Sequence, residues 1–379
     1  MSQSADQEIE PTPNERTLLT GFPAFTARQM AAKILRADAS AHVHLLTRDK
    51  RAADARDFIA TLPKQHQSRI GPVIGDVCDM DLGLAGREVE QLADRVTTIM
   101  HLAGIYYHGV DRATARRVNV EGTRGVLEFA REAKNLRRFC HWSTATVSGK
   151  RRGVVMEDEL DENQGFHNFY EETKFEAEKL ARAAMRRIPV TIFRPGIIVG
   201  DSKSGEIDKF DGPYYLTVLF VTSPLGVRLP LPGRGAAPLH LVPIDYVIDA
   251  AYELSMDLRA AGKTFHLTDP NPYAARRVYS LIAQRSEHQP PRGFIPSSIA
   301  RALLHTPGIE RLARAPLSFL DSFDHLVFYN SHNAQALLAN TSVQCPTFDS
   351  YVDALVKYVR DVHAARRAKL EDEVFDPFD

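Results

Sequence analysis

From Thr17 to about Arg194, short β-prone segments alternate with amphipathic helical stretches. Strands joined through helices lie parallel in one sheet, because such crossovers are right-handed and place helices over both faces. The sequence therefore predicts an α/β fold with a doubly wound parallel sheet. The expected strands are 17–20, 42–47, 72–75, 98–102, 139–143 and 190–194, and the expected helices are 27–35, 51–62, 114–134 and 170–187.

The alternation stops after Gly200. Residues 201–240 are rich in Gly and Pro and interleaved with aromatic residues, and residues 270–340 also lack the strand–helix pattern. We expect these two segments to form a smaller C-terminal region that covers a site on the domain at 16–200. Residues 241–269 and 341–370 are expected to return to the main body.

Composition excludes several classes of protein. The chain is 44% hydrophobic and 25% charged, with a formal net charge of -1, so no overall field favours nucleic acid. Its three cysteines, Cys78, Cys140 and Cys345, are far apart, which indicates a reducing compartment and no zinc site. Apolar runs are too short to span a membrane. These features predict a cytoplasmic protein without nucleic-acid partners.

The two ends of the chain are polar. Residues 1–15 lack an apolar core, so they are not a signal peptide and are expected to be a disordered leader. Residues 371–379 form an acidic tail.

A small-residue loop joins the first strand to the first helix in TLLTGFPAFTARQMAAKIL. The backbone N–H groups of a helix N-terminus favour a diphosphate, and Gly21, Ala24 and Ala27 lie in the register of G-x-x-G-x-x-G. The methyl group of Ala24 stands where the backbone should approach phosphate, which predicts weaker binding. A tight turn also favours Gly without any ligand. The candidate dinucleotide-binding residues of this Rossmann-type loop are Gly21, Phe22, Pro23, Ala24, Phe25 and Thr26.

Basic residues follow the second strand. An NAD site normally has an acidic residue there to accept from the ribose 2′-hydroxyl. Here Arg48 occupies that position and Lys50 follows it. A guanidinium suits a 2′-phosphate, so the sequence favours NADP(H) over NAD as the cofactor. The alternative is a solvated helix start.

A possible proton-transfer pair lies at the start of a later helix. Tyr170 and Lys174 are four residues apart and share one helical face. An ammonium near a phenol favours phenolate, which allows the tyrosine to exchange a proton with a carbonyl or alcohol. The fifth strand ends upstream in Ser143 and Thr144, whose hydroxyls are expected near a nicotinamide.

Several stretches together resemble one known family. They are TGFPAF, VHLLTRDK, IGDVCDMDLGL, IMHLAGIYY, NVEGTRGVLEFA, HWSTATVSG, YEETKFEAEKL, FRPGIIVGDSKSGEIDKFDGPYY and LVPIDYVIDAAYEL, across roughly residues 17–260. The chain resembles the extended short-chain dehydrogenases/reductases. Within them it is similar to the thioester-reductase or male-sterility group, which includes fatty acyl-CoA reductases.

The resemblance implies roles for individual residues. Thr144 would hydrogen-bond the reacting carbonyl beside Ser143, Tyr170 would be the general acid/base, and Lys174 would hold the nicotinamide ribose. Asn119 would support the active-site helix. The implied cofactor contacts are Asp76 and Val77 on the adenine side, Leu102, Ala103 and Gly104 after the fourth strand, and Pro195, Gly196 and Ile197 on the nicotinamide side. No metal is implied.

We therefore predict an NADPH-dependent oxidoreductase that reduces a carbonyl or acyl thioester of an apolar substrate. Aromatic residues between Phe210 and Phe220 could line the pocket of a substrate-capping region or form its packed core. Two alternatives remain open, an NAD-dependent sugar-nucleotide epimerase or dehydratase and a redox-silent NADP-binding regulatory protein. A homodimer is possible by analogy of fold alone.

Overall fold

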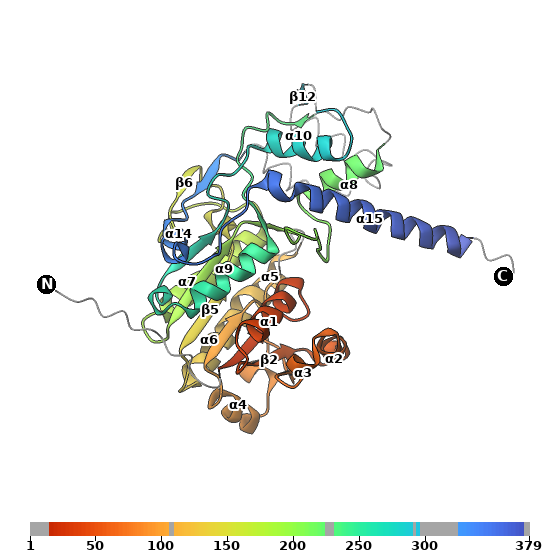
Figure 1. The fold of residues 1–379 in the computed structure, drawn as a ribbon. Coiled ribbons are helices and arrows are strands. Elements are labelled where there is room, and N and C mark those ends of the chain that lie inside the picture. The colour runs from red at the N-terminus through yellow and green to blue at the C-terminus, as the bar shows by residue number, and fades with distance from the viewer. Residues whose placement is uncertain (1–14, 106–109, 224–230, 291–292, 296–324, 375–379) are drawn as a thin grey trace.

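The computed structural model describes residues 15–105, 110–223, 231–290, 293–295 and 325–374 (Figure 1). Seven parallel strands form one sheet in the order β11-β7-β5-β4-β1-β2-β3. This confirms the predicted α/β class with a doubly wound sheet. The strands are β1 (Arg16–Thr20), β2 (His42–Thr47), β3 (Ile70–Ile74), β4 (Thr98–His101), β5 (Arg138–Trp142), β7 (Val190–Pro195) and β11 (Thr264–Leu267).

Helices cover both faces of this sheet because each buries an apolar stripe against it. On one face, α1 (Phe25–Ala37), α9 (Ile244–Met256) and α14 (His332–Leu338) share a hydrophobic core. On the other, α4 (Gly86–Ala93), α6 (Gly122–Glu132) and α7 (Phe169–Ala184) share a second core. The connecting elements are η1 (Asp49–Arg51), α2 (Ala52–Thr61), α3 (Lys64–Gln67), η2 (Met80–Gly83), α5 (Arg112–Ala115), η3 (Arg116–Glu121), η4 (Ala145–Ser148) and η5 (Leu258–Ala260).

The strand order reverses at β1, which lies between β2 and β4. In open parallel sheets, ligands bind beyond the carboxyl ends of the strands at such a switch point. Gly21, Arg48, Gly104 and Thr144 all follow strand carboxyl ends at this edge, as the sequence predicted.

A second region with its own core lies above the carboxyl edge (Figure 1). Its helices are α8 (Tyr214–Thr222), α10 (Ala275–Arg285) and α15 (Phe348–Val374). Segments from 201–240 and 270–340 contact each other in this region through α8 and α10. Short parallel pairs complete the fold: β8 (Ile197–Val199) with β10 (Leu241–Pro243), β9 (Leu231–Pro232) with β12 (Phe294–Ile295), and β6 (Gly153–Val155) with β13 (Val327–Tyr329).

Two expected boundaries need correction. Residues 341–370, which were expected to return to the main body, include most of α15, and α15 packs against α8 and α10 in the second region. Its buried residues Tyr351, Leu355 and Val359 find their apolar partners there. Conversely, α14 lies within 270–340 but packs on β11 and α9 of the main body. Residues 296–324 of that predicted segment lie outside the described part of the chain.

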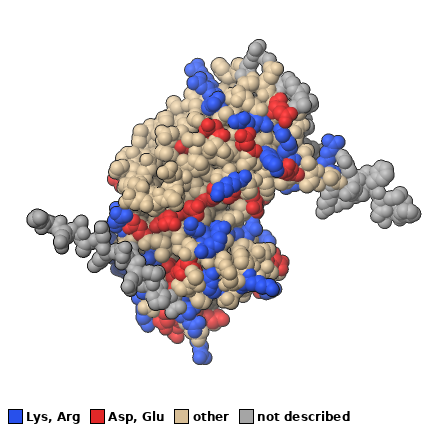
Figure 2. Space-filling model, viewed as in Figure 1, with Lys and Arg blue, Asp and Glu red and all other residues tan. Residues whose placement is uncertain are grey.

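Figure 2 shows acidic and basic side chains intermingled on the face seen in Figure 1. Charges also pair between helices, because Lys33 of α1 lies 2.8 Å from Asp249 of α9.

Candidate active site

Tyr170 and Thr144 meet at the carboxyl edge of the sheet. Thr144 follows β5, and Tyr170 is the second residue of α7, whose N-cap Asn168 accepts from the Glu171 amide at 2.9 Å. The phenol and the threonine hydroxyl share a side-chain hydrogen bond. Burial, opposed by this bond, raises the pKa of Tyr170 to about 12. The phenol therefore holds its proton in the ligand-free site.

Lys174 lies one turn further along α7 and is only 5% exposed. Its ammonium donates to the carbonyl oxygen of Trp142 at the end of β5. A Cβ at Gly104 would lie 3.6 Å from Lys174 Nζ, so this lysine also reaches the loop after β4. Burial lowers the pKa of Lys174 to about 8, and the nearby carboxylate of Glu178 opposes that shift. The sequence-predicted Tyr170, Lys174 and Thr144 are thus brought together.

Asn119 ties the active-site helix to the loop after β4. It lies in η3, a turn of π-helix, a conformation that frequently occurs at functional sites. Its side-chain oxygen accepts from the Ile105 amide at 2.8 Å, and its Nδ2 donates to Thr173 Oγ1 at 3.0 Å. This geometry suits the supporting role that the family resemblance implied.

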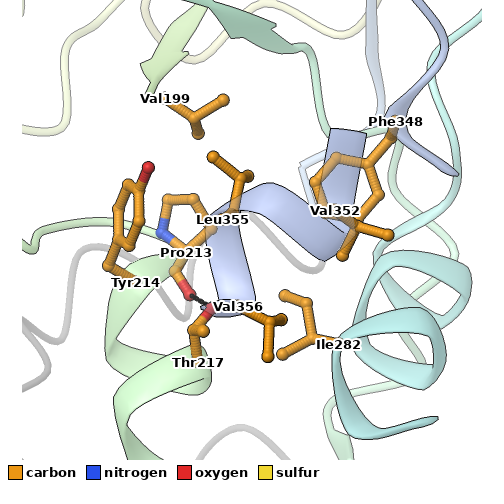
Figure 3. Close-up of a pocket in the computed structure, with 9 residues that line it drawn as sticks. All are labelled: Val199, Pro213, Tyr214, Thr217, Ile282, Phe348, Val352, Leu355 and Val356. Carbon is orange, nitrogen blue, oxygen red and sulfur yellow. Dashed lines mark hydrogen bonds between the residues drawn. The ribbon is translucent and has the colours of Figure 1, made fainter. Parts of the chain in front are cut away.

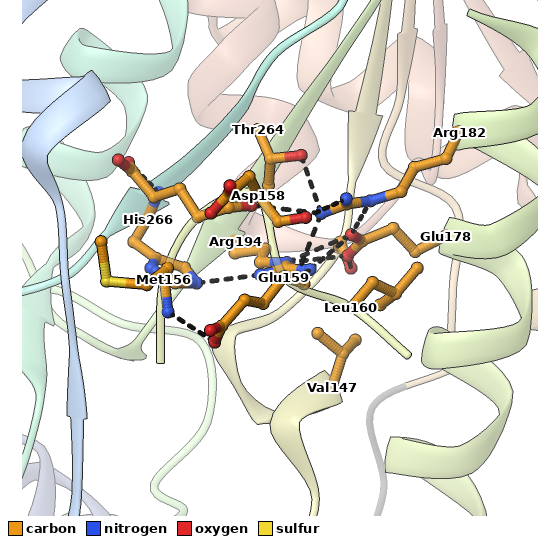
Figure 4. A network of polar contacts seen from close by, with 12 residues as sticks. Val147, Met156, Asp158, Glu159, Leu160, Glu178, Arg182, Arg194, Thr264 and His266 are labelled. Atoms are coloured by element: carbon orange, nitrogen blue, oxygen red, sulfur yellow. Dashed lines mark hydrogen bonds and ion pairs between the residues drawn. The ribbon is translucent and has the colours of Figure 1, made fainter. Parts of the chain in front are cut away.

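Ser143 bonds to a buried ion pair between α7 and β7. Its hydroxyl donates to Glu178 Oε2 at 2.6 Å, and Arg194 donates to Glu178 Oε1 at 2.7 Å (Figure 4). Figure 4 also shows Arg182 and His266 joined to this network. Because Glu178 and Arg194 are both almost fully buried, each requires the other's charge. Ser143 therefore holds the end of β5 in place.

The loop after β1 has the geometry of an anion cradle. Gly21 has φ +97°, and a Cβ there would lie 2.7 Å from the Leu102 backbone carbon, so only glycine fits. Helix α1 has no acidic residue in its first turn and no side-chain cap from Ala24. Its first N–H groups therefore remain available to a diphosphate, and the fully buried Ala27 permits close helix packing.

Two cations follow β2 at the same edge. Arg48 and Lys50 are both exposed, and neither forms an ion pair within the described chain, whereas Arg51 pairs with Asp54 at 2.9 Å. Their guanidinium and ammonium groups are therefore open to an anion. Together with the cradle at Gly21, these residues fit a dinucleotide that carries an additional phosphate.

Other predicted cofactor contacts have structural partners of their own. Phe22 is buried and packs on Phe58 with ring centroids 5.8 Å apart. The Asp76 carboxylate accepts from the Cys78 amide at 2.9 Å, and Val77 packs against α6. The remaining predicted contacts lie around the same edge of the sheet. Pro23 lies between β1 and α1, Phe25 and Thr26 begin α1, and Ala103 follows β4. Pro195 ends β7, and Gly196 joins it to Ile197, the first residue of β8.

Sequence reasoning missed a buried relay centred on His101. Thr123 Oγ1 donates to the Asn119 carbonyl, so it accepts from His101 Nε2 at 2.9 Å. His101 Nδ1 then accepts from Thr20 Oγ1 at 2.9 Å, and Thr20 accepts from the Ala103 amide at 3.0 Å. Burial lowers the pKa of His101 to about 3, which agrees with a neutral ring. The relay joins the end of β1 to α6 through the end of β4.

The model of the male sterility protein family matches residues 19–251, more than half of the chain. The chain belongs to the male sterility protein family. The resemblance to extended short-chain dehydrogenases of the thioester-reductase type, drawn from the motifs, is confirmed. This family assignment also makes the main domain an NAD(P)-binding domain.

Relatives of this male sterility family protein are reductases and synthetases by name. Fatty acyl-CoA reductase wat of Drosophila melanogaster is 27% identical over 281 residues, covering 63% of this chain and 54% of that protein. A linear gramicidin synthase of Brevibacillus parabrevis is 27% identical over 380 residues, covering 92% of this chain and 7% of that protein. The chain thus spans about half, or much less, of these relatives.

A solved structure supports the same relationship. The terminal R domain from the myxalamid PKS-NRPS biosynthetic pathway is 25% identical to this male sterility family protein. The two superimpose with a TM-score of 0.76, covering 94% of this chain and 92% of that one. The likeness therefore includes the second region as well as the NAD(P)-binding domain.

The aromatic run between Phe210 and Phe220 mainly forms the core of that second region. Tyr214, Leu216 and Phe220 are buried in it. A small apolar cavity lies between α8, α10 and α15, and Figure 3 shows Tyr214, Ile282 and Phe348 around it. It has room for about one water molecule, so it is no preformed acyl pocket.

Among the helices that the structure describes, none combines the length and the apolar composition that a membrane span requires.

Proposed function

We propose that this male sterility family protein is an NADPH-dependent oxidoreductase that reduces a carbonyl or an acyl thioester of an apolar substrate. The observation that carries the proposal is the hydrogen-bonded pair of Tyr170 and Thr144 beside the buried Lys174. The name of the Drosophila relative, a fatty acyl-CoA reductase, supports a thioester as substrate.

NADPH would supply the hydride. The first turn of α1 would hold its diphosphate, and Arg48 with Lys50 would bind the 2′-phosphate. Hydride addition to a carbonyl carbon moves an electron pair onto oxygen, which then needs a proton and a hydrogen-bond donor. With a pKa of about 12, Tyr170 retains a proton to deliver, and Thr144 can donate a hydrogen bond to the same oxygen.

Lys174 completes the proton transfer. After Tyr170 gives up its proton, the buried ammonium stabilises the phenolate that remains. With a thioester substrate, the protonated adduct then loses its thiol and leaves an aldehyde. With an aldehyde or ketone, the alcohol is the product.

Cofactor choice is tested by titrating the protein with NADPH and NADH. Arg48→Asp removes a charge-assisted contact and adds repulsion. It should therefore weaken the binding of NADPH by roughly 2–4 kcal/mol and the binding of NADH far less. Arg56→Asp, on the exposed side of α2, is the matched control and should change neither affinity. If Arg48→Asp lowered the affinities for NADPH and NADH equally, Arg48 would have a structural role and would not select the cofactor.

Turnover is tested on a panel of acyl thioesters, aldehydes and ketones with NADPH consumption as the readout. We expect reduction of at least one apolar member of the panel. NADPH binding without turnover on any of them would favour a redox-silent protein. Tight NAD binding with no preference for NADPH would favour an epimerase or dehydratase.

A further inference from the structure

Arg28 brings a guanidinium to the N-terminal end of α1. It is the fourth residue of the helix, and its side chain turns back so that the guanidinium carbon lies 5.5 Å from the Phe25 ring centroid. There it forms an ion pair with Asp208, in the strap of residues 200–213 that leads from β8 to α8. Arg28 Nε is buried and has no hydrogen-bond partner among the described residues.

This placement opposes the helix dipole. A cation is unfavourable near a helix N-terminus, and a partly exposed ion pair contributes little to stability. The side chains of Arg28 and Asp208 are 32% and 39% exposed. Lys33, further along the same helix, pairs instead with Asp249 of α9. Stability of the ion pair alone therefore gives a weak reason for a guanidinium at this end of α1.

The phosphate loop itself is poor in hydrogen-bond donors. Pro23 has no N–H group, and the Ala24 amide already donates to the Gly21 carbonyl at 3.0 Å. The methyl group of Ala24 also stands where the loop should approach phosphate. A diphosphate at this loop would therefore find fewer backbone donors than a glycine-rich loop offers.

We propose that Arg28 is a ligand of the cofactor diphosphate, and that Asp208 holds the same guanidinium when the cofactor is absent. Charge-assisted donors from Arg28 compensate for the donors that the loop lacks. Cofactor binding then exchanges the Asp208 carboxylate for phosphate, so Asp208 competes with the cofactor. The inference rests on the proposed function, because it requires a dinucleotide at this loop.

The strap does not depend on Asp208 for its position. The Ser202 amide donates to Asp245 at 2.9 Å, and Tyr358 Oη donates to the Ile207 carbonyl at 3.3 Å. Loss of the Asp208 charge should therefore leave the strap in place. Asp208→Asn therefore tests the competition between Asp208 and the cofactor for Arg28 without disturbing the fold.

The experiment titrates the 379-residue chain with NADPH and NADH separately, with melting temperature as a check on folding. Arg28→Ala should lower the affinities for NADPH and NADH by the same factor, about 10- to 100-fold, because both cofactors carry the diphosphate. Asp208→Asn should tighten both by about 3- to 10-fold. Arg48→Asp, by contrast, should act mainly on NADPH, and Lys33→Ala should change neither affinity.

The double variant Arg28→Ala/Asp208→Asn completes the cycle. Its affinity should equal that of Arg28→Ala alone, since Asp208 acts only through Arg28. The inference is overturned if Arg28→Ala binds both cofactors as the wild type does, or if Asp208→Asn tightens binding without Arg28. If the wild type binds neither cofactor, the proposed function fails and this inference fails with it.

Discussion

Burial shifts the two ionisable groups of the site in opposite directions. The pKa of Tyr170 rises to about 12 and the pKa of Lys174 falls to about 8. In both cases the neutral form gains, because a low-dielectric surrounding disfavours charge. The site without ligand therefore holds a protonated phenol next to an ammonium that loses its proton readily.

Tyr170→Phe tests the proton donor. The substitution removes the hydroxyl and keeps the ring, so turnover should fall by a factor on the order of 10² or more while NADPH affinity changes little. Lys174→Ala should reduce both turnover and affinity. Tyr273→Phe, whose hydroxyl contacts Asp349 outside the site, is the matched control. Turnover of Tyr170→Phe equal to that of the wild type would refute the mechanism.

Glu178→Gln tests the electrostatic support of Lys174. The Glu178 carboxylate raises the lysine pKa, so neutralising it should lower that pKa below about 8. Activity that needs the ammonium is lost as pH rises through the pKa, and the alkaline limb of the kcat/KM profile should therefore move to lower pH. Glu176→Gln, which loses only its pairing with the partly exposed Arg116, should leave the profile unchanged. A profile of Glu178→Gln that does not move would mean that Glu178 is structural alone.

Single residues could be predicted where their chemistry is local in the sequence. Tyr170 and Lys174 share a helical face and Thr144 follows a strand end, so the sequence placed all three at one edge of the sheet. The contact between Ser143 and Glu178 joins residues 35 positions apart, and that between Thr20 and His101 joins residues 81 positions apart. No periodic pattern indicates such partners, because they arise only when the strands and helices pack.

At the scale of elements, apolar patterns indicated helices and strands but not their neighbours. The strand predicted at 42–47 is β2 (His42–Thr47). Tyr351, Leu355 and Val359 recur at helical spacing on α15, but that spacing does not show that α15 packs on α8 and α10. An amphipathic stripe specifies an apolar partner and leaves its identity open.

The turn between β1 and α1 offers a sharp test at this scale. Gly21→Ala should destabilise the protein by about 1–3 kcal/mol from its positive φ, with a further cost from the Leu102 backbone. It should also weaken both cofactors, since the β1–α1 loop must shift. Gly71→Ala in β3 is the matched control, because a Cβ there meets nothing within 4 Å. Urea denaturation measures the stability of both variants, and titration measures their cofactor affinity. If Gly21→Ala and Gly71→Ala changed both quantities equally, Gly21 would have no special role in the β1–α1 loop.

Across the whole molecule, four buried histidines control the response to acid. Burial lowers the pKa values of His101, His141, His240 and His266, to about 3 for His101 and His266 and about 4 for His240. In the unfolded chain each has a pKa near 6.5. Between pH 6.5 and about 4 the unfolded state therefore binds protons that the folded state excludes, and stability falls as pH falls.

This linkage predicts steep acid unfolding. Each of these histidines adds to the fall in the free energy of unfolding below pH 6.5, because the unfolded chain takes up a proton that the folded protein does not. Glu157 opposes them, because burial raises its pKa to about 7 and the folded state gains its proton between about pH 7 and 4.5. The free energy of unfolding in urea should fall markedly from pH 7 to pH 5.5. Constant stability over that range would contradict the buried neutral histidines.

His141 and His101 provide a matched pair for this linkage, and the two substitutions should have opposite effects. They lie opposite each other on β5 and β4, with ring centroids 5.6 Å apart and both fully buried. Both ring nitrogens of His141 are without a hydrogen-bond partner among the described residues, whereas His101 bonds to Thr20 and Thr123. His141→Leu therefore removes two unsatisfied polar atoms and should raise the melting temperature.

His101→Leu removes one hydrogen bond from each of two buried hydroxyls, so that the Thr20 hydroxyl loses the acceptor for its proton. It should destabilise the protein by about 1–3 kcal/mol and lower the melting temperature. In both variants the free energy of unfolding should fall less steeply as the pH is lowered, since each variant lacks one group that the folded state cannot protonate. Melting curves at pH 7.5 and 5.5 separate the two effects: the sign of the change at pH 7.5 reports hydrogen bonding, and the change in slope reports linkage. Destabilisation of equal size in both variants would show that His141 has a polar partner that its geometry does not reveal.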